Sequence, residues 1–123
     1  MSDQPNEPLP EAERSAFFGF VIIGRNEGSR LEGSLRSVRR LHPDARVVYV
    51  DSGSTDGSVA FALSIGVTVV ELDMSVPFTA GRARNAGFRA LDAHRHGIAF
   101  VQFLDGDCEL EEGWLGIALD VMK

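Results

Sequence analysis

Four short apolar runs recur along the 123-residue chain, and segments with helical periodicity separate them. The runs are rich in aromatic and β-branched residues, which is typical of strands covered on both faces. They lie at residues 16–23, 46–50, 67–72 and 98–104. Because such strands alternate with helices, the sequence predicts an α/β fold: an open, mostly parallel sheet with helices on both faces.

The segments between the runs carry helix signals. In residues 29–41, leucine and valine recur at spacings of three and four with arginines between them, and Ser29 is the expected N-cap. Thr79 is the expected cap of a later helix that runs to about His96. Two further helices are expected over residues 59–65 and 111–122.

The balance of charge argues against a nucleic-acid partner. The chain has 18 acidic and 12 basic residues for a net charge of −6, and an acidic chain is poorly suited to neutralising phosphates.

Residues 1–14 hold four acids and three prolines with little to bury, so we expect a flexible acidic lead-in followed by one domain over residues 15–123.

The sequence has the features of an intracellular protein. A single cysteine, Cys108, allows no internal disulfide and favours a reducing compartment. The first residues lack the pattern of a secretion signal, and no run approaches 18 apolar residues. We therefore expect a cytoplasmic location.

The three histidines, His42, His94 and His96, are interpreted as surface residues.

Polar clusters follow three of the four apolar runs: RNEG after the first, DSGSTDG after the second and DGD after the fourth. The carboxyl ends of parallel strands meet at one edge of a sheet, where open α/β sheets bind ligands. We therefore expect the three clusters to form one binding site.

The last cluster places Asp105 and Asp107 on either side of a glycine. Paired carboxylates suit Mg²⁺ or Mn²⁺, which keep coordination positions open for the oxygens of a diphosphate. The alternative is that Asp-Gly-Asp is a turn with solvated acids. Both interpretations stay open for the tripeptide alone.

The other clusters offer groups for a nucleotide. Asp51 ends the second run, where a carboxylate can accept hydrogen bonds from ribose hydroxyls or a base edge. Arg84 can pair bidentately with phosphate. Asn85 stands beside it in a helix, where an amide side chain often bonds a specific partner. Residues 54–56 are better explained as helix capping.

Four stretches together resemble the nucleotide-binding half of family 2 glycosyltransferases, which have the GT-A fold. They are VIIGRNEGSRLEGSLRSV, VVYVDSGSTDGS, FTAGRARNAGFRAL and VQFLDGDCELEEGW. The resemblance runs from about residue 17 to residue 120. Four motifs in the family's order are more specific than any one of them alone.

The resemblance implies a role for each acidic position. Asp107 matches the principal metal ligand of the family's DxD motif, and Asp105 matches its partner, which contacts the ribose or the metal. Asp51 matches the first aspartate of the loop around base and ribose. A phosphatase of the haloacid dehalogenase type would need Thr or Val where Glu109 stands, so this alternative is disfavoured.

Two residue pairs match further motifs of the family. Arg84 and Asn85 match its RN pair, with the arginine directed at the nucleotide. Asn26 and Glu27 match the NE pair that ends the motif of its first strand. These positions are therefore expected to bind the nucleotide sugar.

Two positions depart from the family. Arg25 stands in the motif that often supplies an aromatic to stack on the base, and its planar guanidinium can stack instead. Ser52 stands where many members have a second aspartate that reads uracil. Arg25 and Ser52 remain expected substrate-binding residues, but the departures weaken any link to uridine.

The resemblance implies inverting, metal-dependent transfer from a nucleotide-diphospho-sugar to an acceptor that the sequence does not identify, with Mg²⁺ or Mn²⁺ as cofactor. Family members continue with an acceptor-binding half that carries the general base. We therefore expect this chain to hold the donor-binding part, to lack an assignable catalytic residue, and to self-associate through the surface that half would cover. The alternative is a non-catalytic nucleotide-binding or interaction module that kept the half-fold.

Overall fold

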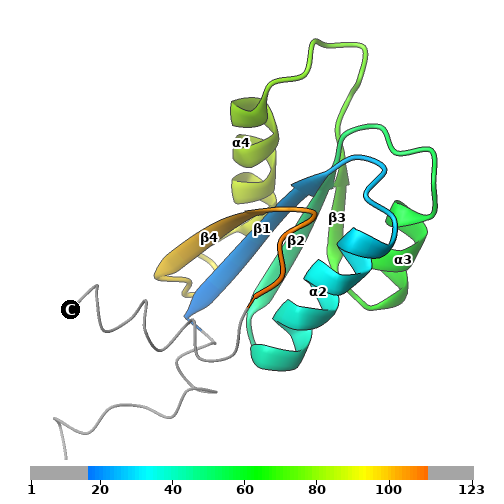
Figure 1. Ribbon diagram of the computed structural model, residues 1–123. Helices are drawn as coiled ribbons and strands as arrows, with labels where there is room; N and C mark the ends of the chain where they lie inside the picture. The colour runs from blue at the N-terminus through cyan, green and yellow to red at the C-terminus, as the bar shows by residue number, and fades with distance from the viewer. Residues whose placement is uncertain (1–16, 111–123) are drawn as a thin grey trace, which may run out of the picture.

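The computed structural model describes residues 17–110 (Figure 1). The elements in chain order are β1 (Phe18–Gly24), α2 (Ser29–Leu41), β2 (Arg46–Asp51), α3 (Ser58–Ser64), β3 (Thr68–Glu71), α4 (Ala80–Leu91) and β4 (Phe100–Asp105). The expected lead-in over residues 1–14 and the expected helix over residues 111–122 lie outside the described residues.

The four strands form one parallel sheet in the order β3-β2-β1-β4. The chain builds outward from β1 through β2 to β3, and α4 then carries it back across the sheet to β4 on the other side of β1. The strand order therefore reverses between β1 and β4. Such a switch point leaves a crevice at the carboxyl ends of the two strands.

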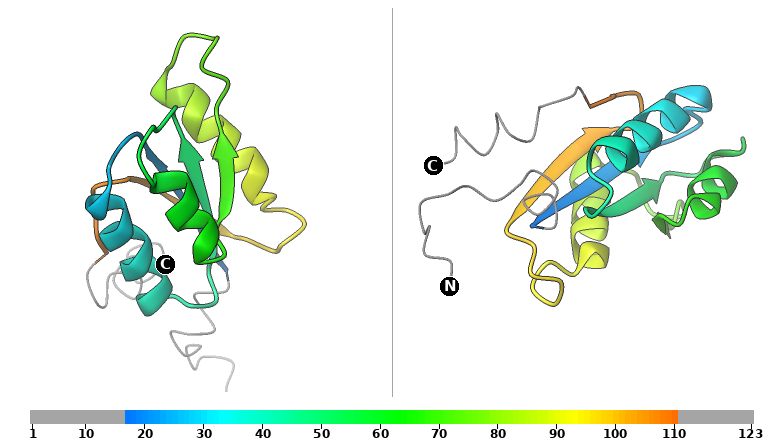
Figure 2. Two further views of the ribbon diagram at one scale, coloured as in Figure 1. Left: turned by 90° about the vertical axis from the view of Figure 1, so that its right-hand side faces the viewer. Right: turned by 90° about the horizontal axis from the view of Figure 1, so that it is seen from below.

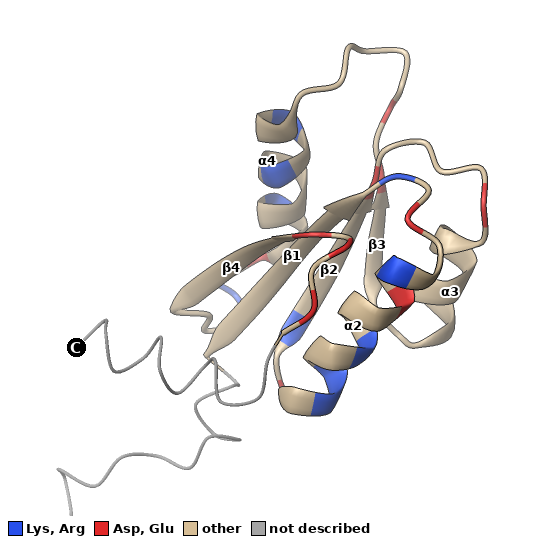
Figure 3. Cartoon of the chain, viewed as in Figure 1, with Lys and Arg blue, Asp and Glu red and all other residues tan. Residues whose placement is uncertain are grey.

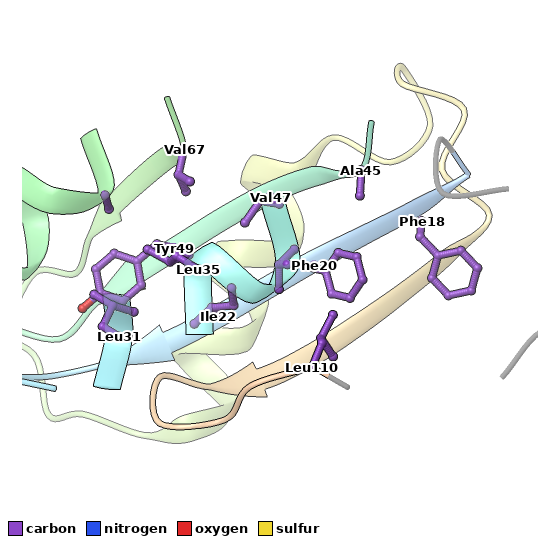
Figure 4. Packing of buried hydrophobic residues seen from close by; sticks show 12 residues of the cluster. Phe18, Phe20, Ile22, Leu31, Leu35, Ala45, Val47, Tyr49, Val67 and Leu110 are labelled. Carbon is purple, nitrogen blue, oxygen red and sulfur yellow. The ribbon is translucent and has the colours of Figure 1, made fainter. Parts of the chain in front are cut away.

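Helices cover both faces of the sheet, as the sequence predicts (Figures 1 and 2). On one face, Phe20 and Ile22 of β1 pack with Leu31 and Leu35 of α2 (Figure 4). On the other face, Val21 of β1 belongs to the core beneath α4. Successive residues of β1 thus enter opposite layers, because side chains alternate across a strand.

Helix α4 lies close to the sheet because it carries Gly87 at the contact. A Cβ atom at this position would lie 2.3 Å from Cγ1 of Val21 and 2.8 Å from Cγ2 of Val50. Any larger residue would push the helix outward. The glycine therefore sets how far α4, and the arginines it carries, stand from the sheet.

The ends of two helices differ from the predictions. Gly28, with a φ of 55°, precedes α2, so Ser29 is the first helical residue and not a side-chain cap. Thr79 does cap α4, since its Oγ1 accepts a 3.0 Å bond from the Arg82 amide. That helix stops at Leu91 because Asp92 adopts the left-handed conformation.

His42 is buried, and its prediction as a surface residue is wrong. It ends α2 with its ring stacked on Phe20, the ring centroids being 5.7 Å apart. The position of His42 directly after α2, against Phe20 of β1, accounts for its burial. Within residues 17–110, no helix is long and apolar enough to cross a membrane.

Candidate functional site

A cavity of about 620 Å³ lies at the carboxyl ends of the strands, at the switch point between β1 and β4. Residues from the loops after all four strands line it, so the sheet edge gathers groups that are far apart in the sequence. Figure 3 shows acidic residues in the turn after β4 and basic residues along α4. The predicted site residues that line it are Arg25, Glu27, Ser52, Arg84, Asp105 and Asp107.

The turn after β4 brings the two aspartates against β1. Asp105 is paired in register with Ile23, and the amide of Gly106 donates a 2.8 Å hydrogen bond to the Ile23 carbonyl oxygen. A Cβ atom on Gly106 would lie 3.2 Å from that oxygen. Glycine thus permits the close turn, and the Asp105 and Asp107 side chains on either side of it remain exposed.

These two carboxylates fit a hard divalent cation. Both line the same open cavity, and carboxylate oxygens are preferred ligands of Mg²⁺ and Mn²⁺. Within the described range, no group of three or more His, Cys, Asp or Glu side chains is arranged to hold a metal. A cation held by Asp105 and Asp107 would therefore complete its coordination with water or with oxygens of a ligand.

Two arginines supply positive charge to the cavity. Arg25 follows β1 and Arg84 lies on α4; both are exposed. Among residues 17–110, neither guanidinium has an ion pair or hydrogen-bond partner. Free guanidinium groups in a cavity suit the oxygens of a phosphate.

Glu27 lines the same cavity but already has a partner. Its Oε1 atom lies 3.1 Å from Nη2 of Arg30 on the first turn of α2. The side chain also lies over glycine backbone, since a Cβ atom on Gly24 would sit 3.3 Å from Cγ of Glu27. Glu27 is therefore held at the rim between the ends of β1 and β4.

Asp51 is buried, and hydrogen bonds within its own loop occupy its carboxylate. Oδ1 accepts from the Tyr49 hydroxyl at 2.6 Å and the Ser54 hydroxyl at 2.5 Å. Oδ2 accepts from the amides of Gly53 at 3.1 Å and Ser54 at 2.8 Å. A carboxylate offers about four lone-pair sites, so all of them are taken. Asp51 organises the loop after β2, and its contact with a ligand stays a prediction.

Asn26 joins the loop after β1 to the loop after β2. It adopts a left-handed φ of 51°. Its backbone N–H donates to Oγ of Ser54 at 2.9 Å, and its side-chain Oδ1 accepts from the backbone amides of Thr55 and Asp56 at 2.7 and 3.2 Å. These bonds hold the loop after β1 against the loop after β2, and Arg25 directly precedes Asn26 in that loop.

Asn26 and Asn85 are not among the residues that line the cavity, although both were predicted to bind the nucleotide sugar. Asn85 is exposed on α4. Conversely, Met74 and Phe78 line the cavity and were not predicted. The signal for them was a group of apolar residues, Met74, Val76 and Phe78, in the loop before the Thr79 cap, outside any expected strand or helix.

Comparison with known proteins places the fold in a recognised group. A family model described as Glycosyl transferase family 2 matches residues 20–123. The crystal structure of S. aureus TarS matches with a TM-score of 0.64 and 19% sequence identity, over 85% of this chain and 19% of that chain. The chain thus spans about a fifth of the length of that structure. No match was found among curated protein sequences.

Proposed function

Because the chain belongs to glycosyl transferase family 2, we propose that it is the donor-binding part of an inverting, metal-dependent glycosyltransferase that uses a nucleotide-diphospho-sugar. The observation that carries the proposal is one cavity in which Arg25 and Arg84 meet Asp105 and Asp107. A diphosphate with a divalent cation needs both sets of charges, and a neutral ligand needs neither.

Arg84 is proposed to bind the diphosphate. Its guanidinium has no partner within residues 17–110, and the cap at Thr79 and the contact at Gly87 fix the helix that carries it. The planar guanidinium group is itself a rigid fork of donors, so little conformational entropy is lost for each hydrogen bond that it forms with a phosphate. Arg25 adds a second positive charge from the loop after β1.

Asp107 and Asp105 are proposed to hold Mg²⁺ or Mn²⁺. When bound, such a cation stabilises the negative charge on the departing nucleoside diphosphate. The two side chains contribute by placing two negative charges on a short, glycine-containing turn whose backbone is hydrogen-bonded to β1. Metal affinity should therefore depend on both carboxylates.

In the proposed reaction, the oxygen of an acceptor hydroxyl forms a bond to the anomeric carbon from the side opposite the diphosphate. The bond between that carbon and the phosphate oxygen breaks, and its electron pair leaves with the nucleoside diphosphate. The hydroxyl proton passes to a general base. No described residue is assigned this role.

A non-catalytic nucleotide-binding module remains the second candidate, and Glu27 favours it. Apart from Asp105 and Asp107, it is the one carboxylate lining the described cavity, so it is the one described candidate there for a general base. Its ion pair with Arg30 occupies this carboxylate and disfavours that role. Incubation with nucleotide sugars and acceptors tests the second candidate: transfer to an acceptor would exclude a non-catalytic module, whereas binding without transfer is expected of both candidates, because no described residue is assigned as the general base. Self-association and a cytoplasmic location stay predictions.

The proposal is tested by calorimetric titration of the full chain with UDP, GDP and ADP, each with Mn²⁺ and each with EDTA. We expect binding that depends on the metal. Equal affinity in Mn²⁺ and in EDTA would remove the metal from the proposal. No binding of any nucleoside diphosphate in Mn²⁺ would refute the donor site itself.

A further inference from the structure

One wall of the cavity is apolar and comes from the loop between β3 and α4. Met74 and Phe78 line the cavity and are 41% and 48% exposed. A cavity wall of large apolar side chains beside a few charged groups is the usual composition of a ligand site. The wall therefore calls for an apolar part in a ligand whose other part is charged.

The loop that carries this wall is held in place. The Arg82 guanidinium donates to the carbonyl oxygens of Val76 at 2.9 Å, Pro77 at 3.0 Å and Asp73. The Asp73 carboxylate in turn accepts from the amide and hydroxyl of Ser75, at 2.9 and 2.6 Å. Arg82 is thus engaged in loop structure, and the apolar wall is preorganised.

Met74 also reaches the neighbouring loop after β2. A Cβ atom on Gly53 would lie 3.0 Å from Cγ of Met74, and Gly53 has a φ of 85°. The thioether side chain therefore covers the backbone of this loop at Gly53. Met74 and Phe78 form one surface that begins at the β2 loop and ends at the start of α4.

Few groups near this surface can read the edge of a planar ligand. The Asp51 carboxylate has its acceptor sites filled by Tyr49, Gly53 and Ser54. Ser52 lines the cavity but is only 5% exposed, and its amide is bonded to the Gly24 carbonyl oxygen. The site therefore offers much to the face of a base and little to its hydrogen-bonding edge.

We propose that Phe78, supported by Met74, is the platform on which the nucleobase of the donor stacks, and that the site discriminates weakly between nucleobases. This inference rests on the proposed function, because it needs a nucleoside diphosphate whose charged end meets Arg84 and Asp107. Stacking tolerates base identity since every base has a π face. The aromatic ring supplies affinity and leaves selection of the donor to its sugar.

The test uses the full chain in Mn²⁺, titrated with UDP, GDP, ADP and inorganic pyrophosphate, which lacks a base. For Phe78→Ala we expect a loss of roughly 5- to 150-fold in affinity for all three nucleotides. Pyrophosphate affinity should stay unchanged, and Phe78→Trp should restore nucleotide binding. The matched control is Phe88→Ala, since Phe88 is 47% exposed on α4 and does not line the cavity.

Each other result has a distinct meaning. Nucleotide affinity that Phe78→Ala leaves unchanged, or a loss that pyrophosphate shares, would overturn the stacking role. A preference of the parent chain for one nucleotide by more than about 100-fold, or roughly 2.7 kcal/mol, would overturn weak discrimination. If neither pyrophosphate nor any nucleotide binds the parent chain, the proposed function is wrong, and the stacking role, which depends on it, is wrong as well.

Discussion

The hydroxyl of Tyr49 donates a 2.6 Å hydrogen bond to the carboxylate of Asp51 beneath the loop after β2. The two residues are two positions apart on one strand, so their side chains lie on the same face of the sheet. Burial of the ring, and then this bond to Asp51, raise the pKa of Tyr49 above its ordinary value.

The first prediction concerns alkaline pH. Tyr49 keeps its proton in the folded state at a pH where the unfolded chain loses it, so the stability it contributes is complete below about pH 10 and falls as the pH rises further. Denaturant unfolding at increasing alkaline pH measures this fall in the free energy of unfolding. The free energy of unfolding of Tyr49→Phe should fall less steeply with pH, because the variant lacks the titrating hydroxyl. Because Tyr49 is the single tyrosine of the sequence, tyrosinate absorbance reports it alone. A midpoint near pH 10 in the folded protein would contradict the prediction.

The second prediction concerns the packing of α4. Gly87→Ala places a methyl group 2.3 Å from Cγ1 of Val21, so we expect a loss of about 1–3 kcal/mol in the free energy of unfolding. Gly81→Ala on the same helix meets nothing within 4 Å. It should stabilise the protein by roughly 0.5–1 kcal/mol through helix propensity. Similar effects of the two substitutions would show that α4 does not lie close to the sheet.

The third prediction concerns the acidic turn. Asp107→Ala should abolish the part of nucleoside diphosphate binding that depends on Mn²⁺, because it removes one of the two exposed carboxylates of the cavity. Stability should change by less than about 0.5 kcal/mol, as for other exposed positions. Asp44→Ala is the control, since Asp44 is exposed and does not line this cavity. Calorimetry in Mn²⁺ and in EDTA that gave the two variants the same profile would rule out the metal role.

The fourth prediction concerns the positive charge on α4. Arg84→Ala should weaken nucleotide binding by roughly 1–3 kcal/mol, the range for losing a charged hydrogen-bond partner. Arg89→Ala should have no effect, because Arg89 is exposed on the same helix outside the cavity. Arg39 makes a poor control: its guanidinium donates to the carbonyl oxygens of Ala45 and Gly66. Equal nucleotide affinities of Arg84→Ala and Arg89→Ala would show that Arg84 does not bind the diphosphate.

The periodicity of apolar residues was enough to predict the parallel sheet and the order of its elements along the chain, and the residue type of Thr79 predicted the cap of α4. These features depend on residues near one another in the chain. The end of α4 was predicted about five residues too late. The pattern of apolar residues gives no indication that Asp92 adopts the left-handed conformation, which ends the helix directly after Leu91.

The site was predictable only in part, because its details depend on contacts between distant segments. The strand ends predicted that Asp105 and Asp107 lie near the RNEG cluster, and Arg25 of that cluster lines the same cavity. Arg84, which was predicted from its residue type and from the resemblance, lines it from α4. A motif gives no sign that Tyr49 and Ser54 fill the acceptor sites of Asp51. Nor does it show that the loop before α4 places Phe78 on the wall of the cavity rather than in the core.

The most direct test of the proposed donor site is to locate Mn²⁺ by its paramagnetic broadening of backbone amide signals, in the presence of UDP. We expect the signals of Gly24, Arg25 and Gly106 to broaden, since these residues line the cavity between β1 and β4. Signals of Arg46 and Thr68, at the starts of β2 and β3, should remain sharp. Broadening at those strand starts, or none that depends on UDP, would contradict the placement of a nucleoside diphosphate and its metal at the switch point.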